Sequence, residues 1–342
     1  MIRCSFPRWR RFQASLLLND ESYEVCRSGT MRDAEAFDRA LLEARAVQEE
    51  RTIVGSGGAI TLSVVRPAVS VGRSGGVLVI HRGGMVSGDR FGGIADQDVL
   101  RGVTEFGIVL VSPEYRLAPA HPAPAGVDDC SATLEWVAAS LAELGIDPGR
   151  IVVSGVSGGG GLAAGAVLLS RDHDGPAVLA QLLVCPLLDD RTATVSARQY
   201  GALAERRVLW PTGNNRWAWD TVLGESHVGG DDISAYAAPS RATDFSGLPP
   251  AYLDCGSAEL FRDEVVDCAS RLWGAGIHAE LHIWAGGVHA FDLLAPDTLV
   301  AIASYTAWEN WLRRILTAGG HASPPRVNSR GVKREKVQNG AV

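Results

Sequence analysis

The sequence lacks the features by which several large classes of protein are recognised. None of its apolar runs approaches the roughly 20 residues that a membrane-spanning helix requires, and it contains no internal repeat. Acidic residues outnumber basic residues by 39 to 32, which gives a net charge of −7 and leaves no basic stripe for nucleic acid. We therefore expect neither a membrane span nor a nucleic-acid partner.

The six cysteines also lack any spacing that would indicate a function. There is no CxxC pair, and no histidines stand near them at zinc-ligand spacing. This pattern is typical of reduced, mostly buried thiols in a cytoplasmic protein, and we expect no structural zinc site. The cysteines are Cys4, Cys26, Cys130, Cys185, Cys255 and Cys268.

What the sequence does contain is an alternation of strand-like and helical patterns. The apolar, strand-like runs are residues 59–65, 76–81, 107–115, 150–156, 180–188, 250–256 and 279–286. The helical stretches are roughly 122–144, 159–172, 260–275 and 297–316. Several runs are apolar almost throughout, as expected for strands covered on both faces. The alternation predicts an α/β fold with a mostly parallel sheet between two layers of helices.

Two regions interrupt this alternation. Residues 1–50 include an amphipathic helical pattern over 32–50, and residues 190–248 are rich in Trp, Gly, Asp and Ser. An insertion of that size is too long for a plain loop, so we expect both regions to form a cap over one end of the sheet. The core is then residues 51–189 and 249–318. The basic start of the chain is interpreted as a solvated leader, with organelle targeting as the alternative, and 319–342 as a disordered tail.

A serine between glycines is the first candidate for chemistry. The segment Gly155–Gly159 reads GVSGG, a G-x-S-x-G pattern that follows an apolar strand and precedes a small-residue helix. One interpretation is a tight strand–helix turn with an incidental serine. The other is a nucleophile elbow, in which glycines give Ser157 a strained, exposed position and the helix directs its N–H groups at the site.

A second glycine turn, at residues 81–85, could supply the N–H groups that stabilise an oxyanion. Here a strand ends at His81 and is followed by Arg82, Gly83, Gly84 and Met85. Adjacent glycines let backbone N–H groups point inward without interference from a Cβ atom, and the N–H of Gly158 could join them. We expect His81 to fix this loop by hydrogen bonding.

With these residues the sequence resembles the hormone-sensitive-lipase-like, bacterial family IV-type carboxylesterase branch of the α/β-hydrolase superfamily. Members carry H-G-G-G where this chain has His81, Arg82, Gly83 and Gly84, so Arg82 replaces the first glycine. Residues 112–130, SPEYRLAPAHPAPAGVDDC, are similar to another segment of the family, in which we expect Arg116 and Asp128 to be scaffold partners. The resemblance covers about 55–316 and implies an α/β-hydrolase fold with a mostly parallel, eight-stranded sheet and a helical cap.

The resemblance also implies an acid and a base. In GSAELFRDE, alignment on the last three residues places Glu259 where the acid belongs, with Asp263 and Asp254 as lesser candidates. In WAGGVHAFD, His289 alone among the histidines follows this acid in a loop after a strand. The chain order Ser157, Glu259, His289 is that of α/β-hydrolases.

The sequence therefore predicts a serine carboxylester hydrolase for small or medium acyl esters, without metal or organic cofactor. Candidate pocket residues are Arg82, Met85, Trp210 and Phe291, with Trp217 and Trp219 as further cap aromatics. Alternatives on the same triad are a lactone, amide or acylated natural-product hydrolase, and a member that binds a small ligand without catalysis. The last strand is a candidate edge through which a homodimer could form.

Overall fold

A computed structural model describes residues 34–69, 72, 74–94, 97–202, 210–224 and 228–317. The predicted leader and the predicted tail lie outside these residues, as do Cys4 and Cys26. Among the helices that are described, none combines the length and hydropathy needed to cross a membrane.

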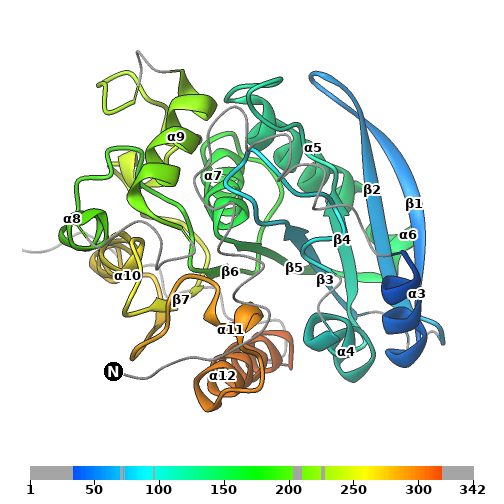
Figure 1. Ribbon diagram of the computed structural model, residues 1–342. Coiled ribbons are helices and arrows are strands. Elements are labelled where there is room, and N and C mark those ends of the chain that lie inside the picture. Colours follow the sequence, from blue (N-terminus) through cyan, green and yellow to red (C-terminus); the bar gives the residue numbers. More distant parts are fainter. Residues whose placement is uncertain are drawn as a thin grey trace, which may run out of the picture.

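The centre of the molecule is an eight-stranded sheet with the order β1-β2-β4-β3-β5-β6-β7-β8 (Figure 1). β2 pairs antiparallel with both β1 and β4, and every other pairing is parallel. The strands are β1 (Ala46–Gly55), β2 (Gly58–Pro67), β3 (Ser74–Ile80), β4 (Val109–Pro113), β5 (Ile146–Val156), β6 (Ala180–Val184), β7 (Ala251–Gly256) and β8 (Ala279–Trp284). The predicted, mostly parallel sheet is confirmed.

Helices cover both faces of this sheet because its strands present apolar side chains in both directions. On β3, Leu78 and Ile80 join a core with α5 (Ala125–Ala139), α7 (Gly158–Asp172) and α10 (Arg262–Gly274). Val77 and Val79 point the other way, into a core with α3 (Ala34–Glu43), α4 (Gln97–Phe106) and α12 (Leu299–Thr317). The other helices of the described residues are α6 (Leu141–Leu144), α8 (Val195–Ala202), α9 (Thr212–Leu223), α11 (Phe291–Leu294) and the short 3-10 helix η2 (Pro239–Arg241).

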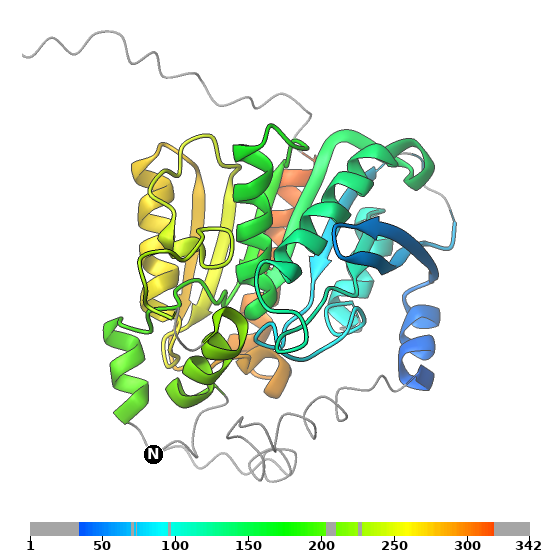
Figure 2. The ribbon, with the colours of Figure 1, turned by 90° about the horizontal axis from the view of Figure 1, so that it is seen from above.

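The N-terminal region differs from the prediction. The helix expected over 32–50 ends at Glu43, and β1 begins at Ala46, so the predicted boundary after residue 50 falls inside a strand. Helix α3 packs against β1 and α4, and its Phe37 ring lies 5.2 Å from the ring of Phe91, in the segment between β3 and α4. Both views place α3 on the opposite side of the molecule from α8 and α9 (Figure 2). The described part of residues 1–50 therefore does not form one cap with residues 190–248.

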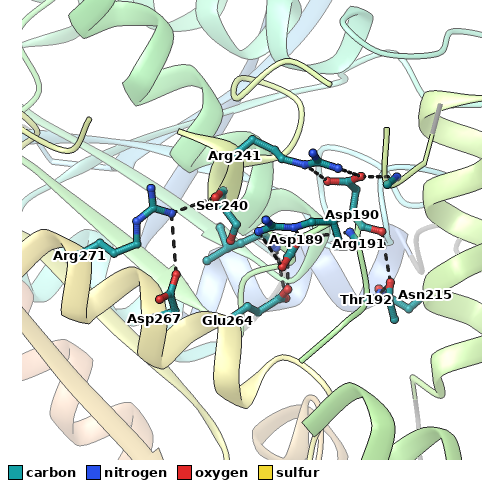
Figure 3. A network of polar contacts seen from close by, with 12 residues as sticks. Asp189, Asp190, Arg191, Thr192, Asn215, Ser240, Arg241, Glu264, Asp267 and Arg271 are labelled. Atoms are coloured by element: carbon teal, nitrogen blue, oxygen red, sulfur yellow. Dashed lines mark hydrogen bonds and ion pairs between the residues drawn. The ribbon is translucent and has the colours of Figure 1, made fainter. Parts of the chain in front are cut away.

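The inserted segment is fixed to the core by a network of charged side chains (Figure 3). Asp190, just after the β6 end of the core, accepts two hydrogen bonds of 2.7 Å from Arg241, at the other end of the insertion. Glu264 on α10 accepts the N–H of Asp189 at 3.0 Å, and Arg271 on the same helix donates to the Ser240 carbonyl at 2.9 Å. Both ends of the insertion are thus held at α10, which leaves α8 and α9 beyond the strand ends.

Candidate active site

Ser157 sits at the turn between β5 and α7 with φ +56° and ψ −122°, a conformation that non-glycine residues rarely adopt. The turn requires the flanking glycines. A Cβ atom on Gly155 would lie 2.1 Å from the Gly159 carbonyl oxygen, and one on Gly159 would lie 2.3 Å from the carbonyl oxygens of Ile80 and His81. The strand–turn–helix context expected of a nucleophile elbow is therefore present, including the strained serine.

The structure brings Ser157, His289 and Glu259 together in one chain of contacts. Ser157 Oγ lies 3.0 Å from His289 Nε2, and His289 Nδ1 lies 2.8 Å from Glu259 Oε2. Both members of the second pair are buried, with 8% and 1% of their side chains exposed. These distances fit a neutral imidazole whose Nδ1–H donates to the carboxylate and whose Nε2 accepts from the serine.

Glu259 and His289 are positioned by two touching turns. Glu259 follows β7 and His289 follows β8, and the N–H of Ala258 donates to the Gly287 carbonyl at 2.9 Å. A Cβ atom on Gly256 would lie 2.1 Å from that same oxygen, so only glycine permits this approach. The Phe261 ring stands edge-on to the His289 ring at 5.0 Å.

The glycine loop after β3 packs directly on the start of α7. A Cβ atom on Gly158 would lie 2.8 Å from the backbone nitrogens of Gly84 and Met85. Gly83 and Gly84 have φ values of +124° and +63°, which favour glycine. Within the described part of the chain, the N–H groups of Gly83, Gly84 and Gly158 donate to no protein acceptor. Free, converging donors of this kind are what an oxyanion requires.

His81 fixes this loop, as the sequence predicts. Its ring is fully buried, and its Nδ1 lies 2.8 Å from the Arg82 carbonyl oxygen. Burial lowers the pKa of His81 to about 4, so the ring is neutral at pH 7 and its Nδ1–H is the donor. Tyr115, which sequence reasoning missed, donates to the His81 carbonyl at 2.9 Å.

The candidate pocket residues occupy different places. The Trp210 ring lies over Gly84, where it would be 2.5 Å from a Cβ atom, and 6.4 Å from the His289 ring. Met85 borders a separate small pocket with Arg116 and His121.

Arg82 and Phe291 each line another cavity. Arg82 donates to the Gly92 carbonyl and lines a cavity on the α4 and α12 side of the sheet. Phe291 packs against Gly287 and lines a small cavity behind Glu259. Trp210 is therefore the candidate pocket residue whose ring lies beside both Gly84 and His289.

The remaining candidates have other partners. Asp263 accepts from the N–H of Ser196 at 2.7 Å. The Asp254 Oδ2 atom accepts from Tyr252, Trp284 and Ser304 at 3.0–3.1 Å. Neither of these carboxylates contacts His289. The expectation that Asp128 pairs with Arg116 is wrong, because Arg116 binds the neighbouring carboxylate, Asp129, through Nε and Nη2 at 2.9 and 2.8 Å. Asp129 is fully buried.

The fold, the serine elbow and the acid–base pair define a class of protein, and comparison with known proteins agrees. Residues 77–293 match the model of a family described as alpha/beta hydrolase fold. The chain belongs to this family, in its hormone-sensitive-lipase-like branch, and it is a carboxylesterase-type serine hydrolase.

Among proteins of this family, the chain is similar to Carboxylesterase NlhH of Mycobacterium tuberculosis. The two are 37% identical over 231 residues, which are 64% of this chain and 68% of the relative. Esterase LipI of the same organism is 32% identical over 217 residues, 63% of this chain and 65% of the relative. Among solved structures, a bacterial heroin esterase has a TM-score of 0.78 and 35% identity, covering 89% of this chain and 93% of that one. Esterase LipW from Mycobacterium marinum has a TM-score of 0.77 and 29% identity, covering 91% and 95%.

Proposed function

We propose that the chain hydrolyses carboxylic esters with Ser157 as nucleophile, His289 as general base and Glu259 as the carboxylate that orients the base. The observation that carries this proposal is the unbroken series of contacts from the serine hydroxyl through both imidazole nitrogens to the carboxylate. A serine hydroxyl is a weak nucleophile at neutral pH, so it needs an adjacent base held in the correct tautomer. A module that only bound a ligand would not need this arrangement.

In the proposed cycle, Ser157 Oγ attacks the ester carbonyl while His289 Nε2 takes its proton. The C–O bond to the leaving alcohol then breaks as His289 returns that proton to the alkoxide oxygen. Water, deprotonated by the same nitrogen, then attacks the acyl-enzyme carbonyl. The acyl–Oγ bond breaks to release the acid, and His289 returns the proton to Ser157 Oγ. Glu259 keeps its negative charge throughout and stabilises the imidazolium that forms in each half of the cycle.

We propose that the N–H groups of Gly83, Gly84 and Gly158 bind the oxyanion of each tetrahedral intermediate. They are supported in this role by their position around the serine turn and by their lack of an acceptor among the described residues. Donors already in place need no reorganisation when charge develops, and one such donor contributes about 10²–10³ in rate.

The proposed substrates are esters of small or medium acyl groups. The Trp210 ring over Gly84 limits the space above the proposed oxyanion site, which favours a compact acyl group. Because one similar structure is named a heroin esterase, the acetate of a bulky polycyclic alcohol belongs in the substrate panel. Lactones and amides pass through similar tetrahedral states and test the alternative chemistries.

The test compares wild type with Ser157→Ala and with Ser154→Ala, a serine on β5 that lines the cavity on the α4 and α12 side of the sheet. We expect hydrolysis of p-nitrophenyl acetate and butyrate to fall by at least about 10⁴ in Ser157→Ala and to be nearly unchanged in Ser154→Ala. A fluorophosphonate should label one site in wild type and Ser154→Ala, and none in Ser157→Ala. Retained turnover or labelling in Ser157→Ala would overturn the assignment.

We also propose a cytoplasmic location and a homodimer through β8. The cysteines described by the structure are free and buried, which supports a reducing compartment. β8 is the last strand of the sheet, and each of its residues is partly exposed, so its outer side is open to a second copy. Light scattering on wild type and on Ile283→Pro would detect such a dimer and its loss.

A further inference from the structure

A buried thiol adjoins the proposed acid and base. Cys185 immediately follows β6, with φ +37°, and its N–H donates to the Asp254 carbonyl at 2.7 Å. One donor atom each from Cys185, Glu259 and His289 lie within 4.8 Å of one another. Sulfur, carboxylate oxygen and imidazole nitrogen are the atoms that bind Zn²⁺ and similar thiophilic cations in proteins.

The carboxylate in this group has spare binding capacity. Glu259 Oε2 receives the His289 contact, whereas Oε1 is buried and accepts no hydrogen bond of ordinary geometry in the described structure, although the Cys255 thiol lies near the carboxylate. A buried carboxylate oxygen without a partner is uncommon and indicates a missing ligand or water. Since Glu259 is almost fully buried, bulk water does not compensate for this orphaned oxygen.

The cavity beside this group is lined without a cationic side chain. A cavity of about 10 Å³ lies behind Glu259 and is bordered by Cys185, Asp254 and Asp292. Its full lining holds three carboxyl groups, two thiols and one hydroxyl, and includes no lysine or arginine. A cation bound beside Glu259 therefore meets no positively charged side chain in the lining of this cavity.

We propose that Cys185, Glu259 and His289 form a binding site for a thiophilic divalent cation such as Zn²⁺, whose occupancy blocks hydrolysis. Ligands of a tetrahedral Zn²⁺ ion lie roughly 3.4–3.6 Å apart at the usual bond lengths. The three donor atoms must therefore approach one another by about 1 Å at most. Rotamer adjustments of Cys185 and Glu259 supply this movement. A solvent molecule can complete the fourth position.

A bound cation inhibits hydrolysis because it changes the tautomer of His289. Cation binding itself does not depend on the proposed function, whereas inhibition does. The cation takes His289 Nδ1 in place of the proton that now points at Glu259, and this proton moves to Nε2. The Cys185 thiol proton leaves to solvent. With a proton on Nε2, the imidazole no longer accepts the Ser157 proton, so the base is blocked while the cation is bound.

The experiment measures binding and inhibition separately on wild type, Cys185→Ser and Cys268→Ser. Cys268 is an equally buried free cysteine on α10 outside the group, and Cys4 and Cys26 remain in every variant. Co²⁺ is the binding probe, because a cobalt–thiolate bond gives a charge-transfer band in the near ultraviolet. Circular dichroism establishes that each variant is folded, and Cys185→Ala replaces Cys185→Ser if the latter is not.

We expect wild type and Cys268→Ser to bind one Co²⁺ with this band and to be inhibited by Zn²⁺, reversibly on chelation. Cys185→Ser should lose the band and require at least tenfold more Zn²⁺ for half-inhibition. Absence of the band in wild type, or its retention in Cys185→Ser, overturns the proposed site. The Co²⁺ titration is repeated in Ser157→Ala, which lacks the proposed nucleophile, so a failure of the esterase mechanism cannot be mistaken for a failure of the metal site.

Discussion

The hydroxyl of Tyr115 donates to the carbonyl oxygen of His81 at 2.9 Å, and the two rings stack with centroids 4.0 Å apart. His81 is the last residue before the glycine loop, and its ring in turn contacts the Arg82 carbonyl. Both residues are almost fully buried. The stacked, hydrogen-bonded rings of His81 and Tyr115 therefore hold the start of the loop that carries Gly83 and Gly84.

Tyr115→Phe should test this support without creating a cavity. The change leaves a buried carbonyl oxygen without its donor, which costs about 1–3 kcal/mol in the free energy of unfolding. We expect kcat/KM for p-nitrophenyl butyrate to fall roughly tenfold, since small displacements of positioned donors are costly. Tyr236→Phe is the matched control, because its hydroxyl bonds an exposed carboxylate, Asp172. Equal effects of the two changes would contradict the proposed support.

Gly84→Ala should combine backbone strain with a clash against Trp210. A Cβ atom there would lie 2.5 Å from the indole ring at φ +63°. We expect a rate loss of about 10² and a stability loss of several kcal/mol, part of which is recovered in Gly84→Ala/Trp210→Ala. Gly145→Ala is the control for strain alone, because its φ is +70° and the nearest atom is 3.9 Å away. Urea unfolding should give a coupling of at least about 1 kcal/mol between positions 84 and 210. If the losses in the free energy of unfolding of the two single variants simply added up in the double variant, the Trp210 ring would not restrict position 84.

Asp254 should make stability depend on pH. Burial raises the pKa of Asp254 to about 7 in the folded chain, although Trp284, Ser304 and Tyr252 donate to it. Between pH 4 and 7 the folded chain holds a proton that the unfolded chain has lost, so the free energy of unfolding falls as pH rises through this window.

Asp254→Asn cannot ionise and should lose this dependence. Between pH 5 and pH 8, ionisation of Asp254 should lower the free energy of unfolding of wild type by about 3 kcal/mol. The same pH change should cause no such loss in Asp254→Asn. Denaturant titrations at both pH values measure the difference. Asp263→Asn is the control, because the pKa of that carboxyl is lowered rather than raised. Parallel pH profiles for wild type and Asp254→Asn would refute the assignment.

The Asp190–Arg241 pair should be a principal attachment of the inserted segment. Its carboxylate is fully buried, and 13% of the arginine side chain is exposed. Arg241→Gln leaves the carboxylate without its cation and should cost about 3–5 kcal/mol. Arg314→Gln, which breaks an exposed pair with Glu280, should cost less than about 1 kcal/mol. Thermal unfolding of the two variants gives the comparison. A small loss for Arg241→Gln would mean that the segment is held mainly by apolar packing.

Much of this architecture could be predicted because local pattern and burial agree. The strand-like run at 76–81 corresponds to β3, whose residues are buried on both faces, and the helix expected over 159–172 begins one residue earlier. The sequence does not predict β1, because the polar residues 48–51, QEER, are typical of a helix end. In the structure these side chains lie on an antiparallel edge strand that is largely exposed. Helix α4 was not predicted, although its apolar residues recur at helical spacing and Leu100 and Val103 are fully buried.

The geometry of the candidate site was predictable only where a motif fixes it. Ser157 and His289 stand in glycine turns of recognisable pattern, and the structure places them in contact. No sequence motif marks Cys185 as part of a site. Its neighbours Glu259 and His289 lie in the turns after β7 and β8, more than 70 residues away in the chain. The preference of Arg116 for Asp129 over Asp128 is likewise decided by which side of α5 faces the core, a one-residue difference that composition does not encode.

The backbone contact between Gly256 and Gly287 couples the turns that carry Glu259 and His289 into one mechanical unit. Neither turn can be lengthened or exchanged for that of another enzyme without displacing its neighbour. Attempts to alter this protein by loop grafting should therefore transfer both turns together. The glycine loop after β3 is tied in the same way to the start of α7, where Gly84 meets Gly158.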